Sequence, residues 1–194
     1  MTKVGIIGGA FDPPHTGHIE LARSVLMSEV VNEVWLMPCQ THLYNKKMEA
    51  FGHRLRMCKL AVKGSPIKVF DYENIRNLSG STLETFQSLK KEPYSASIEY
   101  YCVIGLDNAN TINLWKNQED LIKSVRFIIV KRPGFEKING AWYDSRPHLF
   151  INTLTPDVSS TSIRKFLSDI SRKINMVSPD VLSYIEKNNL YKGA

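Results

Sequence analysis

The sequence lacks the features that mark membrane, disulfide-stabilised and zinc-binding proteins. No apolar run approaches the roughly 18 residues that a membrane-spanning helix needs, and the strand-like start of the chain shows no pattern of a secretion signal. The three cysteines, Cys39, Cys58 and Cys102, are odd in number and widely spaced, which fits neither a disulfide framework nor a zinc site. We therefore expect a cytoplasmic protein without membrane contact, whose cysteines are reduced and structural.

Internal repeats, low-complexity tracts and linkers are also missing. The 194 residues are 43% hydrophobic and 23% charged, close to the average of soluble globular domains. This length supports one substantial core but is short for two. We predict a single domain over residues 1–194, with a C-terminal helical part over residues 154–194.

A long basic arm, common in proteins that bind nucleic acid, is missing as well. The formal net charge of +6 favours an anionic partner, but the basic residues come in short pairs such as Lys131-Arg132 and Arg164-Lys165. We therefore expect contacts to a small phosphorylated ligand and no nucleic-acid partner.

Short buried strands alternate with helical patterns along the chain. The apolar run Val4–Ile7 ends in two glycines, and helical spacing of apolar residues follows from Ile19. Similar strands are predicted at residues 33–37, 67–70, 100–105 and 125–130. This alternation predicts an α/β fold, a Rossmann-like doubly wound parallel sheet with flanking helices and a small C-terminal helical region.

Four helix starts carry capping signals. Ser81 and Glu84 have the spacing of a capping box and open a helix to about Lys90. The other signals are Asn117, the Ser159-Ser160 pair and Ser178-Pro179. Residues 135–146 are weakly periodic, which predicts a surface loop or a sheet edge without a readable role.

The first strand runs into a site for an anion. Gly8 and Gly9 let the backbone approach a phosphate, and the following helix directs its free N–H groups to the same place. The pattern matches neither the dinucleotide fingerprint nor a P-loop. His15 and His18 can both face the crevice and bind phosphate oxygens. The alternatives are a histidine that only caps or packs against the helix, and a zinc site, which lacks a third ligand at recognisable spacing.

The stretch Gly8-Gly9-Ala10-Phe11-Asp12-Pro13-Pro14-His15-Thr16-Gly17-His18 resembles the signature of the nicotinate and nicotinamide mononucleotide adenylyltransferases. This family belongs to the nucleotidyltransferases with a His-x-Gly-His motif, in which the histidines hold the triphosphate of ATP. The resemblance assigns that role to His15 and His18.

A second stretch, Val158 to Arg164, resembles the Ser-Ser-Thr-x-Ile-Arg segment of the same family. Hydroxyls and free N–H groups at a helix start can cradle phosphates, and the forked cation of Arg164 can bind the leaving pyrophosphate. On its own, the segment would be an ordinary helix cap.

Two further stretches, Val103 to Trp115 and Phe127 to Gly134, extend the resemblance over nearly the whole chain. Asp107 can accept hydrogen bonds from ribose hydroxyls or an amine, and Trp115 offers a face to a pyridine ring unless it is a core or rim aromatic. For ATP the resemblance implies contacts from Gly8, Gly9, Ala10, Phe11, His15, His18, Gly105, Asp107, Ser159, Ser160, Thr161, Ile163 and Arg164. For the mononucleotide it implies contacts from Phe11, Lys46, Lys47, Thr82, Leu106, Asp107, Trp115 and Arg132.

The resemblance is uneven over residues 38–56. Many bacterial nicotinate enzymes carry Pro-Pro-His-Lys where this chain has residues 38–43, Pro-Cys-Gln-Thr-His-Leu. Residues 44–47 and 53–57 resemble the branch that also accepts nicotinamide mononucleotide. A lysine here should reach phosphate, and Lys46 and Lys47 both stay open, as does a mobile solvated loop.

The reaction implied is an in-line attack of the mononucleotide phosphate on the α-phosphorus of ATP, which yields deamido-NAD or NAD and pyrophosphate. Because the attacking phosphate is already ionised, catalysis rests on positioning and charge neutralisation by His15, His18 and Arg164. Mg²⁺ would enter with ATP and need few protein ligands, so we expect no dedicated metal site. Asp12 has no evident role as a base.

Three alternatives stay open. The phosphopantetheine adenylyltransferases share the fold, but their motif usually has threonine at the place of His15. A non-catalytic nucleotide sensor or a basic nucleic-acid-binding module could also keep this fold. Members of the resembled family are often homo-oligomers, so the partners expected are ATP, a pyridine mononucleotide and further copies of the chain.

Overall fold

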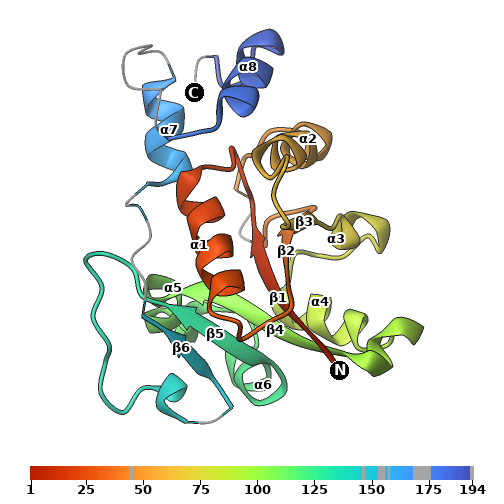
Figure 1. Ribbon diagram of the computed structural model, residues 1–194, viewed down its shortest axis with the longest axis vertical. Coiled ribbons are helices and arrows are strands. Elements are labelled where there is room, and N and C mark those ends of the chain that lie inside the picture. The colour runs from red at the N-terminus through yellow and green to blue at the C-terminus, as the bar shows by residue number, and fades with distance from the viewer. Residues whose placement is uncertain (44–45, 146, 153–155, 157, 168–175, 193–194) are drawn as a thin grey trace.

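A single parallel sheet forms the centre of the molecule (Figure 1). The computed structural model describes residues 1–43, 46–145, 147–152, 156, 158–167 and 176–192. The sheet has the order β3-β2-β1-β4-β5-β6, and every neighbouring pair is parallel. Its strands are β1 (Thr2–Gly9), β2 (Glu33–Pro38), β3 (Lys68–Val69), β4 (Ile98–Gly105), β5 (Arg126–Val130) and β6 (Leu149–Ile151). The predicted α/β fold is confirmed, and the short edge strand β6 is the one strand that the apolar pattern missed.

Helices connect the strands and cover both faces of the sheet. They are α1 (Thr16–Met27), α2 (Phe51–Ala61), α3 (Tyr72–Ile75), α4 (Thr82–Leu89), α5 (Leu106–Asn110), α6 (Gln118–Ser124), α7 (Ser160–Phe166) and α8 (Pro179–Lys187). Short 3₁₀ turns are η1 (Pro93–Ser97), η2 (Ile112–Leu114) and η3 (Trp142–Asp144). None of the helices within the described ranges is long and apolar enough to cross a bilayer.

The central strands are apolar on both faces because helices cover both. Val4 and Ile6 of β1 belong to a core that includes Phe86 of α4 and Leu121 of α6. Ile7, the next residue along the strand, belongs to the opposite core, which α1 and α2 cover. This burial explains why the strands appear in the sequence as continuous apolar runs instead of alternating patterns.

A third core joins the C-terminal helices to α2. Met57 of α2 is buried with Ile163 of α7 and with Val181 and Ile185 of α8. In Figure 1, α7 and α8 lie together at one end of the molecule, beyond the start of α1. The helix predicted after Ser159 forms as α7, and the chain from 168 to 175 lies outside the described residues.

Two predicted capping interactions are wrong. Ser81 precedes α4, but its side chain caps nothing, because the Glu84 carboxylate accepts instead from the backbone N–H and the hydroxyl of Ser79. Asn117 precedes α6 in a left-handed conformation, φ 55°, with no side-chain cap. Ser159 and Ser178 do cap their helices, accepting from Ser162 N–H and Val181 N–H.

Residues 135–145 pack onto α5 before the chain enters β6. The indole N–H of Trp142 donates to the Ala109 carbonyl at 2.9 Å, and the buried Tyr143 hydroxyl donates to Asn110. The segment therefore covers the end of α5, whereas Arg146, the last residue of the region, lies outside the described residues.

Candidate active site

A cavity lies where the strand order reverses. The chain leaves β1 toward β2 and leaves β4 toward β5, so a crevice opens between the carboxyl ends of β1 and β4. A pocket of about 530 Å³ occupies this place, and Gly9 and Gly105 both line it. Its size is that expected for a small-molecule site.

The two motif histidines stand together at this pocket. The imidazole rings of His15 and His18 stack with centroids 3.7 Å apart, and both rings line the pocket. The backbone N–H of His15 donates to Nδ1 of His18 at 3.2 Å. Because Nδ1 is the acceptor, the proton of a neutral His18 ring sits on Nε2, which stays available to a ligand. The capping contact of His18 is therefore compatible with the ligand role considered for these histidines.

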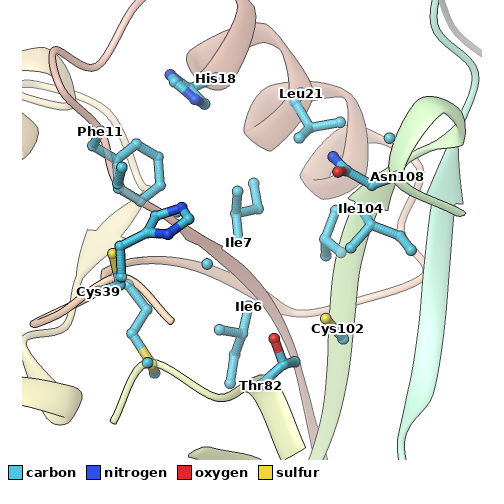
Figure 2. Close-up of a pocket in the computed structure, with 18 of the residues that line it drawn as sticks. Ile6, Ile7, Phe11, His18, Leu21, Cys39, Thr82, Cys102, Ile104 and Asn108 are labelled. Carbon is cyan, nitrogen blue, oxygen red and sulfur yellow. The ribbon is translucent and has the colours of Figure 1, made fainter. Parts of the chain in front are cut away.

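Two neighbouring residues lie close to these rings, Gly17 beside His15 and Phe11 against His18. A side chain at Gly17 would bring its Cβ within 3.0 Å of His15 Nδ1, so the glycine of His-x-Gly-His leaves room for the ring. Phe11 is buried in a left-handed conformation, φ 48°, and its ring meets His18 edge-on at 4.8 Å. A non-glycine residue in this conformation costs about 1 kcal/mol or more and persists only where packing enforces it. Figure 2 shows Phe11 and His18 on the same side of the pocket, across from Thr82.

Both histidines are uncharged at neutral pH. Burial, with a smaller effect of the Arg132 guanidinium, lowers the pKa of His15 to about 4. The pKa of His18 is also lowered well below its ordinary value, first by burial and then by His15 and Arg132. His15 Nδ1 is buried without a hydrogen-bond partner among the described residues. The pair therefore offers neutral imidazoles in a pocket wall, and an incoming anion would supply the missing partner.

Residues of the second motif donate hydrogen bonds to the backbone of the first. Ser159, Ser160 and Thr161 line the pocket at the start of α7. The Ser160 hydroxyl donates to the Pro13 carbonyl at 2.9 Å, and Arg164 Nη1 donates to the Asp12 carbonyl at 2.7 Å. Two segments more than 140 residues apart thus form one wall.

Arg164 and Ile163 both belong to α7, but their side chains have different surroundings. The Arg164 guanidinium also donates to the Thr161 hydroxyl at 3.3 Å, and it is not among the residues that line the described pocket. Ile163 is buried in the core formed with α8, so only its backbone can face a ligand.

Asp107 and Arg132 form an ion pair at the end of β4. Arg132 Nη1 lies 2.8 Å from Asp107 Oδ2, and Nη2 donates to the Val158 carbonyl. A Cβ at Gly105 would come within 2.3 Å of Asp107 Oδ1, so the carboxylate packs directly on the glycine backbone. Oδ1 itself is buried without a partner among the described residues, and Asp107 is not among the residues that line the pocket.

Most of the remaining predicted residues line the pocket, and two of them do not. Gly8, Ala10, Lys46, Thr82, Trp115 and Arg132 line the pocket. Lys47 is described but does not line it, and Leu106 is buried in the core beneath α5. Cys39, expected to be structural, instead lines the pocket as a half-buried free thiol. Cys102 also lines the pocket but is buried, and Cys58 is buried.

Three buried polar residues around the site had no signal in the sequence. Glu73 lines the pocket at 6% exposure, and Arg54 at 1% exposure donates to the backbone carbonyls of Ala10, Gln40 and Glu49. The Tyr191 hydroxyl donates to the buried Asp12 carboxylate at 2.7 Å. Each stands in a stretch that looks like ordinary surface sequence, because most of its partners come close only in the fold.

The fold and the pocket define a nucleotidyltransferase of the Rossmann type. The chain matches the model of the cytidylyltransferase-like family over residues 6–166, and it belongs to that family. Nicotinate-nucleotide adenylyltransferase of Bacillus subtilis is 34% identical over 195 residues, which cover 99% of this chain and all of the relative.

Solved structures give the same answer. Plasmodium falciparum nicotinic acid mononucleotide adenylyltransferase complexed with NaAD matches with a TM-score of 0.84 at 25% identity, covering 98% of both chains. The same enzyme complexed with APC matches with a TM-score of 0.80 at 26% identity over 98% of both chains. The chain therefore belongs to the nicotinate-nucleotide adenylyltransferase family, as its motifs predicted, and is an enzyme of the EC 2.7.7 class.

Proposed function

We propose that this enzyme transfers the AMP moiety of ATP to nicotinate mononucleotide in NAD biosynthesis. A phosphate oxygen of the mononucleotide attacks the α-phosphorus, the bond to pyrophosphate breaks, and deamido-NAD forms. The observation that carries the proposal is the pair of neutral, stacked imidazoles of His15 and His18 in one pocket with the start of α7. Relatives with names of this activity match the chain over almost its full length.

His18 and His15 hold the triphosphate of ATP in this proposal. Their donor nitrogens stabilise charge that moves to the leaving pyrophosphate, and fixed donors do this without reorganising during the reaction. Arg164 uses two of its N–H groups on Asp12 and Thr161, so others are left for the pyrophosphate. ATP is also contacted by Gly8, Gly9, Ala10, Phe11, Gly105, Asp107, Ser159, Ser160, Thr161 and the backbone of Ile163.

The mononucleotide occupies the other part of the pocket. Trp115 stacks on the pyridine ring, Thr82 approaches the ring substituent, and Lys46 or Lys47 reaches the phosphate. Phe11, Leu106, Asp107 and Arg132 complete this side. Lys46 is the better placed lysine, since it lines the described pocket and Lys47 does not.

Mg²⁺ enters with ATP in this mechanism. Among the described residues, no three His, Cys, Asp or Glu side chains gather to hold a metal ion. In the proposal, Mg²⁺ would be carried by the phosphate oxygens of ATP, where it would neutralise charge on the triphosphate.

Nicotinamide mononucleotide is a second acceptor in the proposal. The segment at residues 38–47 differs from that of many nicotinate enzymes, and five of its residues line the pocket, Cys39, Thr41, His42, Leu43 and Lys46. A homo-oligomer remains a prediction.

Product analysis tests the assignment. The enzyme is incubated with ATP, Mg²⁺ and nicotinate mononucleotide, and the dinucleotide is identified by mass. We expect deamido-NAD and one pyrophosphate for each turnover. ATP binding without product would instead indicate a nucleotide sensor.

A further inference from the structure

Glu73 is a buried carboxylate in the pocket wall that the mechanism above does not use. It lies on α3 and is 6% exposed. Oε1 accepts from the Thr85 hydroxyl at 2.9 Å, and Oε2 accepts from the Gln40 backbone N–H at 3.3 Å. The side chain therefore joins two segments that both line the pocket, the chain after β2 and the start of α4.

Gln40 is held on its other side as well. Its carbonyl accepts from Arg54 Nη2 at 3.2 Å, and Arg54 Nη1 donates to the Ala10 carbonyl in the first motif at 2.8 Å. Both backbone groups of one residue are thus fixed by buried charged side chains. Beyond Gln40 the chain continues into Thr41, whose hydroxyl donates to the Ser79 carbonyl, and His42, and both line the pocket.

Thr85 links Glu73 to α4. Its hydroxyl lies 2.9 Å from Glu73 Oε1 and 3.1 Å from the Ser81 carbonyl, one turn before. Ser81 and Thr82 line the pocket at the start of this helix. Glu73 therefore fixes the position of Thr82 relative to the segment at residues 40–43.

We propose that Glu73 is a positioning residue, which holds the Gln40 segment and the start of α4 together to form the mononucleotide side of the pocket. The inference rests on the proposed function for its substrate but not for its structural test. ATP is held by the β1 loop and α7, which lie outside the Glu73 contacts.

Ionisation of Glu73 would then control this wall. Burial raises the pKa of Glu73 to about 7, with a smaller upward effect of Glu84, while Thr85, the Gln40 N–H and Arg54 oppose it. The ionised carboxylate makes charge-assisted hydrogen bonds with both partners, whereas the neutral acid makes weaker hydrogen bonds with the same groups. The wall should therefore loosen as the pH falls below about 7, and the KM for the mononucleotide should rise.

Glu73→Gln tests the positioning role, with Glu33→Gln as the matched control. Glu33 also accepts from protein donors, Trp35 and Lys68, but it begins β2, at the end of the strand away from the pocket. Glu73→Gln replaces a charged acceptor by a neutral amide and so weakens these hydrogen bonds, which predicts a KM for the mononucleotide raised roughly five- to tenfold, with the KM for ATP and kcat within about twofold. The wild type and Glu33→Gln should show an inflection near pH 7 in kcat/KM for the mononucleotide, and Glu73→Gln should lack it.

Two results would overturn the inference. One is an equal rise of both KM values in Glu73→Gln with the inflection retained, which would mean a general structural role. The other is an unchanged KM for the mononucleotide.

Hydrogen exchange separates this inference from the proposed function. The protection factor of the Gln40 amide should fall by about tenfold in Glu73→Gln, and in the wild type between pH 8 and pH 6. It should stay unchanged in Glu33→Gln. Thr85→Val, which removes the other contact while keeping Gln40 bonded, should leave Gln40 protected, and the wild-type comparison needs no variant to fold. A protection factor independent of pH would contradict the inference even in an enzyme with full activity.

Discussion

The backbone N–H of His15 donates to Nδ1 of His18, so one motif histidine sets the orientation and tautomer of the other. The rings then stack at 3.7 Å, and burial keeps both uncharged. The spacing of His-x-Gly-His follows from this arrangement. The first histidine precedes α1, the second stands in its first turn, and a glycine between them leaves room for the ring of the first.

His18→Ala should lose most turnover while the protein stays folded. His18 works on the transferring phosphates in this account, and removing one well-placed donor costs about 10²-fold in kcat. The measurement is steady-state pyrophosphate release, together with circular dichroism to check the fold. His53→Ala is the control, because His53 contacts Tyr184 between α2 and α8, away from the pocket. Near-normal kcat in folded His18→Ala would remove His18 from the mechanism.

Arg132→Gln should raise the pKa of both histidines. Arg132 is the smaller of the causes that lower them, so the values should move up yet stay below 6.5, because the burial remains. Titration of the imidazole resonances by NMR measures this shift, with the neighbouring Lys131→Gln as a control for the loss of one charge.

The sign of the related stability change follows from the lowered pKa of His15. Folded protein binds fewer protons than unfolded protein between pH 6.5 and about 4, so the free energy of unfolding falls as the pH drops through that window. Arg132→Gln should make this fall smaller. Unshifted histidine resonances would show that Arg132 does not act on the pair.

Gly17→Ala should separate activity from stability. Alanine in a helix is favoured over glycine by roughly 0.5–1 kcal/mol, but its Cβ would force the His15 ring aside from a contact of 3.0 Å. We expect an unchanged or higher melting temperature and a drop in kcat/KM of roughly tenfold, because small displacements at a reacting site are costly.

Gly52→Ala is the matched control for this change. Gly52 is the second residue of α2, as Gly17 is of α1, and a Cβ there meets nothing within 4 Å. Its kcat/KM should equal that of the wild type. Equal activity of the two variants would show that the room beside His15 has no catalytic importance.

Tyr191→Phe should weaken the first motif from the far end of the chain. The phenol donates to the Asp12 carboxylate, which is 2% exposed, and burial together with Asp12 raises the pKa of Tyr191, so the phenol stays protonated. Removing the donor should lower the free energy of unfolding by about 1–3 kcal/mol. Urea denaturation measures the loss.

The KM for ATP should rise along with this loss of stability, because Asp12 belongs to the motif loop. Tyr184→Phe removes another tyrosine hydroxyl of the C-terminal region, one that meets His53. Tyr184→Phe should lower the free energy of unfolding by less than Tyr191→Phe does, and it should leave the KM for ATP unchanged. Equal behaviour of the two variants would separate Tyr191 from the motif loop.

The sheet and the two motifs could be predicted because each is specified by residues that are close together in the sequence. Val4–Ile7 and the glycines after it specify a buried strand and a tight loop within a few residues. The short edge strand β6 was missed because its three residues, although all apolar, are too few to form the run that indicates a strand. The Ser81 cap failed because Glu84 reached Ser79, a choice between two nearby serines that spacing does not make.

Glu73, Arg54 and Tyr191 could not have been found in this way. Their partners are groups brought close only by the fold, such as the Gln40 backbone, the Ala10 carbonyl and the Asp12 carboxylate. In the sequence, a buried charge and a solvated charge look the same. Glu73 and Arg54 both hold the Gln40 backbone, which lies in the segment where the resemblance to the family is uneven.

The most direct test of the account is pyrophosphate release from ATP and Mg²⁺ with each acceptor supplied separately. The acceptors are nicotinate mononucleotide, nicotinamide mononucleotide and phosphopantetheine. We expect pyrophosphate release with nicotinate mononucleotide, and His18→Ala should lose most of it. We expect no pyrophosphate release with phosphopantetheine. Release with phosphopantetheine alone, or with none of the three, would contradict the account.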